Sequence, residues 1–202
     1  MHDQVGRFTQ FVKAQLPESF EGKQVLDVGS GDVNGNNGYL FTNCTYTGND
    51  VFAAPNVTVV CKTSALEFAD ESFDTIISTE CFEHDPEYEA SLKKIVGMLR
   101  PGGLFVFTCA STGRPEHGTR RTSPQDSYGT IGNVDGWPDY YKNLTIDDVD
   151  AAIGLNATFS TYASYYCTPP YDLYFWGVKK GGPAIGPVAV YTADNTTLTR
   201  SV

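Results

Sequence analysis

The chain has 202 residues, 41% of them hydrophobic and 19% charged, which fits one globular domain of ordinary composition. Its formal net charge of −10 disfavours nucleic acid or an anionic membrane surface as a partner, because a strongly acidic protein repels phosphate groups. No run of about 18 apolar residues occurs, and no basic segment followed by an apolar one opens the chain, so we expect neither a membrane span nor a signal peptide.

The first elements follow from hydrophobic spacing. Residues 5–16 carry apolar side chains at helical spacing, and Pro17 ends that helix. The short, β-branched run at 24–28 stops at a glycine and predicts a buried strand. The following segment, 32–43, is rich in glycine and asparagine and predicts at most a short helix.

The middle of the chain predicts strands that alternate with loops or helices. Residues 86–99 have helical spacing, and the Arg-Pro-Gly-Gly sequence at 100–103 ends that helix. Four more apolar runs predict strands at 45–49, 57–61, 73–78 and 104–109. This order predicts an α/β fold, a Rossmann-like three-layer sandwich with a mostly parallel sheet between helices.

The last third differs in character. Segment 111–143 is long, polar and rich in Gly, Pro, Arg and Tyr, and loops of this length are uncommon unless they bind something. Residues 145–153 predict a helix capped by Thr145. Runs at 159–166 and 173–178 predict an antiparallel pair of strands. We therefore expect one domain over residues 1–180, with a substrate loop at 111–143, and an extended or frayed tail at 181–202.

Five cysteines lie far apart and form no C-x-x-C pair, so we expect no disulfide framework, no metal site and a cytoplasmic location; they are Cys44, Cys61, Cys81, Cys109 and Cys167.

The first strand runs into a glycine turn, Gly29-Ser30-Gly31, which allows a close approach of backbone to a ligand at the carboxyl edge of the sheet. A dinucleotide site would need a third glycine where Asn34 stands. Asp27, two residues before the first glycine, suits the ammonium of an amino acid better than a pyrophosphate. Asp50, at the end of the second strand, can accept both hydroxyls of a ribose. The pattern favours an adenosyl amino acid, although a plain turn with a surface acid is the simpler alternative.

These residues resemble the class I, S-adenosylmethionine-dependent methyltransferases, and most closely their type 11 group. The resemblance covers about residues 20–110. It rests on VLDVGSGD at 25–32, YTGNDV at 46–51, the segments at 64–68 and 73–80, and LRPGGL at 99–104. A weaker match is YYKNLT at 140–145.

The resemblance implies a seven-stranded sheet whose last strand is antiparallel, and S-adenosyl-L-methionine as the cofactor. It implies contacts to the methionine part from Asp27, Gly29, Ser30, Gly31, Thr79 and Glu80, and contacts to the ribose and adenine from Asp50, Val51, Ser64, Ala65 and Leu66. Ser64 departs from the family, which has an aspartate there that contacts the adenine amino group.

Methyl transfer needs a general base only when the acceptor is protonated. Two histidines are candidates: His84, just after the fourth predicted strand, and His117, in the loop after the fifth. Both have a structural alternative, as a cap or as an ordinary loop residue.

The acceptor would be a small molecule methylated on oxygen or nitrogen, with anionic and glycan-related molecules among the candidates. Arg114, Arg120 and Arg121 can bind an anion, or can pair with neighbouring acids to fix the loop. Tyr140 and Tyr141 can wall the pocket or pack the loop down. Two other functions remain open: a non-catalytic cofactor-binding module of the same fold, and a nicotinamide-dependent oxidoreductase.

Overall fold

A computed structural model describes residues 3–33 and 35–202, so the expectation for Asn34 lies outside the described residues. One sheet forms the centre, with the strand order β3-β2-β1-β4-β5-β7-β6-β8. The strands are β1 (Gln24–Val28), β2 (Thr45–Asp50), β3 (Val59–Val60), β4 (Phe73–Thr79), β5 (Leu99–Ala110), β6 (Phe159–Cys167), β7 (Asp172–Lys179) and β8 (Thr196–Ser201).

The first five strands are parallel, and β7 runs antiparallel to both β5 and β6. This confirms the predicted Rossmann-like α/β fold with its antiparallel strand. The sheet has eight strands where seven were expected, because residues 196–201 pair with β6. The predicted third strand shrinks to two residues at the edge of the sheet.

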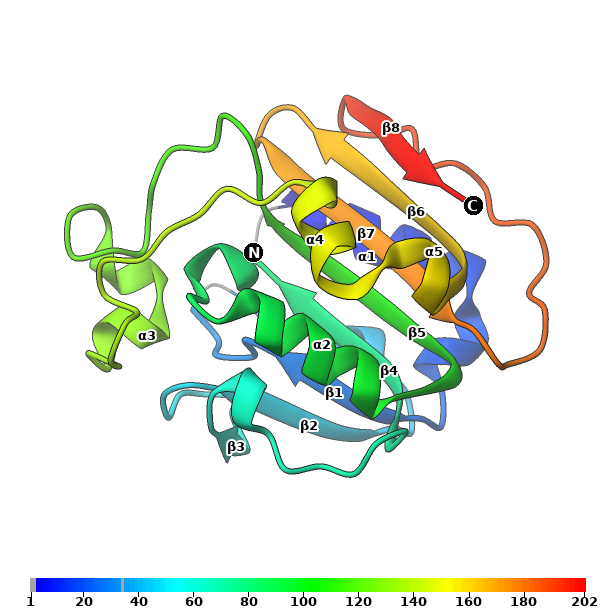
Figure 1. Ribbon diagram of the computed structural model, residues 1–202, viewed down its shortest axis with the longest axis horizontal. Helices are drawn as coiled ribbons and strands as arrows, with labels where there is room; N and C mark the ends of the chain where they lie inside the picture. The colour runs from blue at the N-terminus through cyan, green and yellow to red at the C-terminus, as the bar shows by residue number, and fades with distance from the viewer. Residues whose placement is uncertain (1–2, 34) are drawn as a thin grey trace.

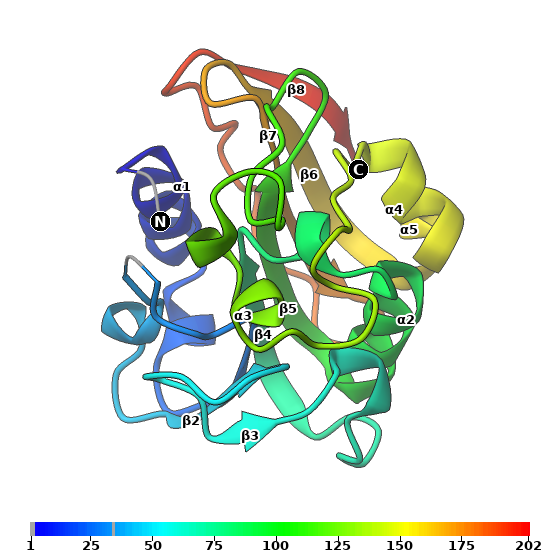
Figure 2. The same ribbon diagram turned by 90° about the vertical axis from the view of Figure 1, so that its left-hand side faces the viewer.

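Helices cover both faces of the sheet. Figures 1 and 2 show α1 on one face and α2, α4 and α5 on the other. The α-helices are α1 (Asp3–Gln15), α2 (Tyr88–Met98), α3 (Tyr128–Ile131), α4 (Ile146–Ile153) and α5 (Leu155–Thr158); short 3-10 turns are η1 (Pro17–Phe20), η2 (Gly38–Leu40), η3 (Thr63–Ala65), η4 (Phe82–His84) and η5 (Pro124–Asp126). Among the described residues, no helix is long and apolar enough to span a membrane.

Two apolar clusters hold the layers together. One packs α2 and α4 against the sheet through Leu92, Ile95 and Val149. The other packs α1 against the opposite face through Phe8 and includes Tyr191 of the C-terminal segment. Each cluster buries apolar surface on one face of the sheet, and this burial is the main favourable contribution to folding. The tail is thus packed over α1 and the sheet rather than frayed.

The helix at 146–153 shows why its prediction held. The Thr145 hydroxyl accepts a hydrogen bond from the backbone of Asp148, and the Asp148 carboxylate accepts one from the Thr145 backbone. This reciprocal pair satisfies two backbone donors that a helix start leaves open. α4 therefore begins where the sequence signal placed it, and it brings segment 111–143 back over the sheet edge.

Candidate functional site

A pocket lies at the carboxyl edge of the parallel strands, where β1, β2 and β4 end side by side. Open α/β sheets bind their ligands at this edge. Segment 111–143 forms the opposite wall, and in Figure 2 its helix α3 lies in front of the strand ends. The lining residues are Asp27, Gly29, Ser30, Gly31, Val33, Gly35, Asn36, Asn37, Asp50, Val51, Thr63, Thr79, Glu80, Cys81, His84, Asp85, Arg114, His117, Asp126, Ser127, Tyr128, Gly129 and Trp137.

Asp27 is a buried acid at the base of this pocket, with 1% of its surface exposed. Its carboxylate accepts a hydrogen bond of 3.1 Å from the Asn37 side chain and another from the Tyr46 hydroxyl. Burial raises the pKa of Asp27 to about 7, against the opposing effect of these two hydrogen bonds. A cation placed beside this acid would favour its ionised form.

The glycine turn leaves no room for larger residues. Gly29 has a φ of +70°, and a Cβ there would lie 2.4 Å from Cys81 Sγ. A Cβ on Gly31 would lie 2.3 Å from the ring of Tyr128 and 2.8 Å from an Asp50 carboxylate oxygen. The turn therefore lies tightly between η4 and α3, with its backbone forming the pocket floor.

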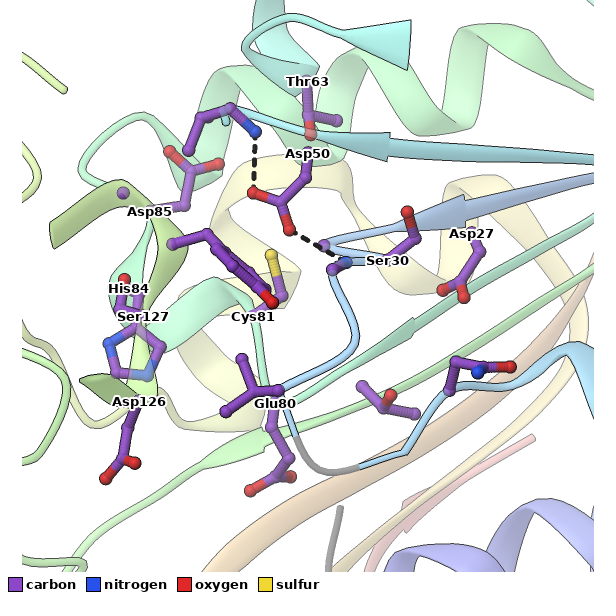
Figure 3. A pocket seen from close by; sticks show the side chains of 18 of the residues that line it. Asp27, Ser30, Asp50, Thr63, Glu80, Cys81, His84, Asp85, Asp126 and Ser127 are labelled. Carbon is purple, nitrogen blue, oxygen red and sulfur yellow. Dashed lines mark hydrogen bonds between the residues drawn. The ribbon is translucent and has the colours of Figure 1, made fainter. Parts of the chain in front are cut away.

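Asp50 connects the turn to the end of β2. Its carboxylate accepts a hydrogen bond of 3.0 Å from the Gly31 amide and one of 2.7 Å from the Val51 amide (Figure 3). Burial raises the pKa of Asp50, and the backbone amides around it counteract that effect. Hydrogen bonds from the glycine turn and from Val51 therefore fix the orientation of the Asp50 carboxylate.

The end of β4 supplies Thr79 and Glu80. The Thr79 hydroxyl accepts a hydrogen bond of 3.1 Å from Asn37, the same amide that contacts Asp27. Glu80 adopts a φ of +53°, a conformation uncommon for residues with a side chain. Its carboxylate accepts a hydrogen bond of 2.9 Å from the Thr108 hydroxyl. Both residues line the pocket, as the resemblance implied.

The residues expected at adenine do not line this pocket, and their contact with adenine stays a prediction. Ser64, Ala65 and Leu66 are not among the lining residues; Ser64 donates a hydrogen bond of 2.5 Å to Glu87, and Leu66 is buried in the core. Thr63, one position earlier, lines the pocket, and its hydroxyl donates a hydrogen bond of 2.9 Å to the side-chain oxygen of Asn49. These residues lie in or next to the turn η3, and the spacing of residues in the sequence does not predict which of their side chains lines the pocket.

Both candidate histidines line the pocket, and their rings lie 4.9 Å apart. Burial lowers the pKa of His84 to about 3, so this imidazole is neutral at physiological pH and a weak base. His117 Nδ1 lies 3.2 Å from the carbonyl oxygen of Pro115, and its Nε2 lies 4.0 Å from a Glu83 carboxylate oxygen. Glu83 is fully buried, and burial together with the nearby Glu80 carboxylate raises its pKa well above the usual range.

Of the three arginines, only Arg114 reaches the pocket. It donates hydrogen bonds of 3.0 Å to the Pro170 carbonyl and 3.3 Å to Asp172, a buried acid whose pKa burial raises to about 8. Arg120 and Arg121 are exposed and pair with Asp139, and Arg121 also pairs with Glu116. This is the loop-fixing arrangement that the sequence left as an alternative.

The two tyrosines do not line the pocket among the described residues. The ring of Tyr141 packs against His84 and His117, with ring centroids 5.7 Å and 5.1 Å apart. Its hydroxyl donates a hydrogen bond of 3.2 Å to the Pro115 carbonyl oxygen. The next residue, Lys142, donates its backbone N–H to the Glu83 carbonyl. Tyr140 and Tyr141 thus belong to the segment that fastens the loop to η4.

Several lining residues carried no sequence signal of their own, notably Asn37, Cys81, Asp85 and Ser127. Asn37 lies in the asparagine-rich stretch, where neighbouring asparagines look alike. Only the fold selects the one that contacts Asp27 and Thr79.

Comparisons with known proteins agree with this geometry. A family model described as a methyltransferase domain matches residues 26–107. A fatty-acid O-methyltransferase of Mycolicibacterium smegmatis is 33% identical over 105 residues, 45% of this chain and 38% of that protein. A ubiquinone biosynthesis O-methyltransferase of Parvibaculum lavamentivorans is 32% identical over 116 residues, 52% of this chain and 42% of that protein. The chain therefore spans less than half the length of these curated relatives.

Solved structures share the fold. The 1,6-didemethyltoxoflavin-N1-methyltransferase of Burkholderia thailandensis, solved with S-adenosylhomocysteine, has a TM-score of 0.58 at 19% identity; 85% of this chain and 77% of that chain are covered. Phosphoethanolamine N-methyltransferase 2 of Haemonchus contortus, solved with S-adenosyl-L-methionine, has a TM-score of 0.56 at 15% identity, covering 85% and 52%. At these identities the likeness concerns the fold alone.

Proposed function

We propose that the chain is a class I, S-adenosylmethionine-dependent methyltransferase of the type 11 group, which the methyltransferase-domain match over residues 26–107 and the two curated relatives support, and that it transfers a methyl group from S-adenosyl-L-methionine to an oxygen or nitrogen of a small-molecule acceptor. The observation that carries the proposal is a pair of acids, buried Asp27 and partly buried Asp50, on either side of a glycine turn with no room for a Cβ.

The residues fit this cofactor. Asp27 would face the ammonium, because a buried carboxyl group with a pKa of about 7 gains most from a nearby cation. Asp50 would accept the ribose hydroxyls, and the backbone of Gly29 to Gly31, which lines the pocket, would lie along the methionine chain. The cofactor when bound supplies an activated methyl group, and the protein contributes position and orientation.

The acceptor would enter from the side of segment 111–143. Arg114, His117 and Trp137 line the pocket there, so this wall offers a guanidinium, an imidazole and an apolar ring. Arg114 already binds the buried Asp172, which weakens the case for a strongly anionic acceptor. The curated relatives are named as O-methyltransferases, which supports an oxygen acceptor over a nitrogen one.

Calorimetric titration with S-adenosyl-L-methionine and with S-adenosylhomocysteine tests the proposal, followed by assays with methyl-labelled cofactor on a panel of hydroxylated, carboxylated and amine acceptors. We expect micromolar binding and label transfer to at least one acceptor. Absence of binding up to millimolar concentrations would refute the proposal. Binding without any transfer would identify a non-catalytic module, and binding of a nicotinamide dinucleotide alone would identify an oxidoreductase.

A further inference from the structure

A group of potential metal ligands lies on the inner wall of the pocket, beside the proposed cofactor residues. Glu83 and His84 come from η4, and His117 comes from the segment after β5. Each offers one ligand atom, and the three atoms lie within 4.8 Å of one another. Figure 3 shows the His84 ring at this wall, on the side of Asp126 and Ser127.

The Glu83 carboxylate is poorly paired for a buried acid. Its side chain is 0% exposed, and neither carboxylate oxygen has a hydrogen bond of good geometry within residues 3–33 and 35–202. The backbone N–H groups of Glu83 and Ala110 lie near enough to lower its pKa, but they do not offset the effect of burial. Buried polar groups are hydrogen-bonded in the great majority of cases, because an unpaired one loses its hydration without compensation. His117 Nε2 lies 4.0 Å from one Glu83 carboxylate oxygen, which is too far for a hydrogen bond.

The histidines are arranged as ligands commonly are. His117 Nδ1 lies 3.2 Å from the Pro115 carbonyl, and donation there leaves the lone pair of Nε2 directed toward Glu83. A metal-binding histidine typically donates its second ring N–H to a carbonyl or carboxylate in this way. In the part of the chain that the structure describes, buried His84 Nδ1 also has no hydrogen-bond partner.

We propose that Glu83, His84 and His117 bind a divalent transition-metal ion, with zinc, manganese and iron as the matching class. Two imidazoles and one carboxylate suit these ions, whereas magnesium and calcium prefer oxygen ligands throughout. Metal bonds of about 2.0–2.2 Å place ligand atoms on one side of an ion about 3.0–3.5 Å apart, so the three side chains must close by about an ångström to complete the site.

The ion would face the pocket, because His84 and His117 both line it. Three protein ligands on one side leave coordination positions for water or for the acceptor. This inference rests on the proposed function and narrows it: an ion here favours acceptors that can coordinate it, such as a carboxylate or hydroxyl, over protonated amines, which have no free lone pair. It departs from the cysteine pattern, which predicted no metal site, because none of the three ligands is a cysteine.

The test is a metal titration of the chelator-stripped full chain with zinc, manganese and magnesium chlorides, followed by calorimetry and by thermal melts. We expect one ion per chain, with zinc or manganese much tighter than magnesium, and a higher Tm on binding. Glu83→Gln and His117→Ala should each weaken binding by more than about 100-fold, beyond the 10- to 100-fold effect of losing a group that only orients a ligand. Glu18→Gln, on the exposed turn η1, is the matched control and should bind as the original chain does.

The result that overturns the inference is absence of binding by the folded chain up to millimolar metal, or binding that survives both substitutions. If Glu83→Gln fails to fold, His117→Ala decides, since its side chain is partly exposed at the pocket wall. Titrating the same preparations with S-adenosyl-L-methionine separates the two proposals: cofactor binding without metal binding contradicts this inference alone.

Discussion

Replacing Asp27 with asparagine removes a buried acid while keeping its size and its ability to accept from Asn37. In the original chain the raised pKa means that the folded state holds the Asp27 proton more tightly than the unfolded state does. The unfolded chain loses that proton near pH 4 and the folded chain near pH 7. Stability therefore falls as pH rises through this interval, and the loss is complete above pH 7.

The size of the effect follows from the pKa. The shift from 3.8 to about 7 is roughly three units, and each unit corresponds to about 1.36 kcal/mol, so the ionised acid costs the empty protein about 4 kcal/mol above pH 7. About 2–3 kcal/mol of that cost develops between pH 5 and pH 8. Asparagine does not ionise, so Asp27→Asn should gain about 2–3 kcal/mol of stability relative to the original chain over this range.

Urea unfolding of both proteins at pH 5 and pH 8 measures that difference, with Asp70→Asn, an exposed position, as the matched control. Calorimetry with S-adenosyl-L-methionine measures the effect of the substitution on cofactor affinity. The original chain should bind the cofactor more tightly as pH rises toward 7, releasing a proton. The variant should bind more weakly and with no such pH dependence.

Two results would refute the reasoning. A stability difference that stays constant between pH 5 and pH 8 would mean that Asp27 ionises as an ordinary carboxyl group. Unchanged cofactor affinity in Asp27→Asn would mean that this acid does not meet the ammonium.

Three further substitutions address other parts of the site. Asp50→Ala removes the acceptor of the Gly31 and Val51 amides and the proposed ribose contact, and calorimetry should show cofactor affinity reduced by about 10- to 100-fold, as expected for hydrogen bonds to a charged group; unchanged affinity would contradict the ribose assignment. Gly29→Ala places a Cβ 2.4 Å from Cys81 Sγ at a positive φ and should cost about 1–3 kcal/mol in urea unfolding, whereas Gly186→Ala, with no atom within 4 Å, should cost far less. Thr145→Ala breaks the reciprocal cap of α4 and should cost about 1 kcal/mol while cofactor binding stays intact; an equal loss in Thr197→Ala, on an exposed part of β8, would argue against a capping effect.

The sequence predicted those parts of the molecule that depend on local patterns. Apolar runs ending at glycine or acid identified β1, β2 and β4, and the cap at Thr145 identified α4. Asp27 and Asp50 were found because each stands at the carboxyl end of a strand, and parallel strands bring those ends together.

The sequence did not predict features that depend on tertiary contacts. Tyr128 lies over Gly31 and donates to the Asp32 carbonyl, a contact across 96 positions that no spacing reveals. Thr63 lines the pocket and Ser64 does not, although both belong to the 3-10 turn η3 and are polar residues of similar size. Arg120 and Arg121 read as ligand-binding cations until their partners on the same loop are seen.

The eighth strand protects the end of the sheet. An unpaired edge strand can pair with another molecule, and β6 would be such an edge without β8, with Tyr165 and the apolar cluster directly behind it. The sequence of β8, Thr-Thr-Leu-Thr-Arg-Ser, is short and polar, and Arg200 forms ion pairs of 2.5 Å and 2.6 Å with Asp147 and Asp150 of α4. β8 thus pairs with the hydrogen-bonding edge of β6 and replaces it with a polar edge that pairs less readily with another molecule. We expect a chain shortened at residue 180 to keep every pocket residue and yet to aggregate, so residues 181–202 would protect the edge of the sheet rather than take part in catalysis.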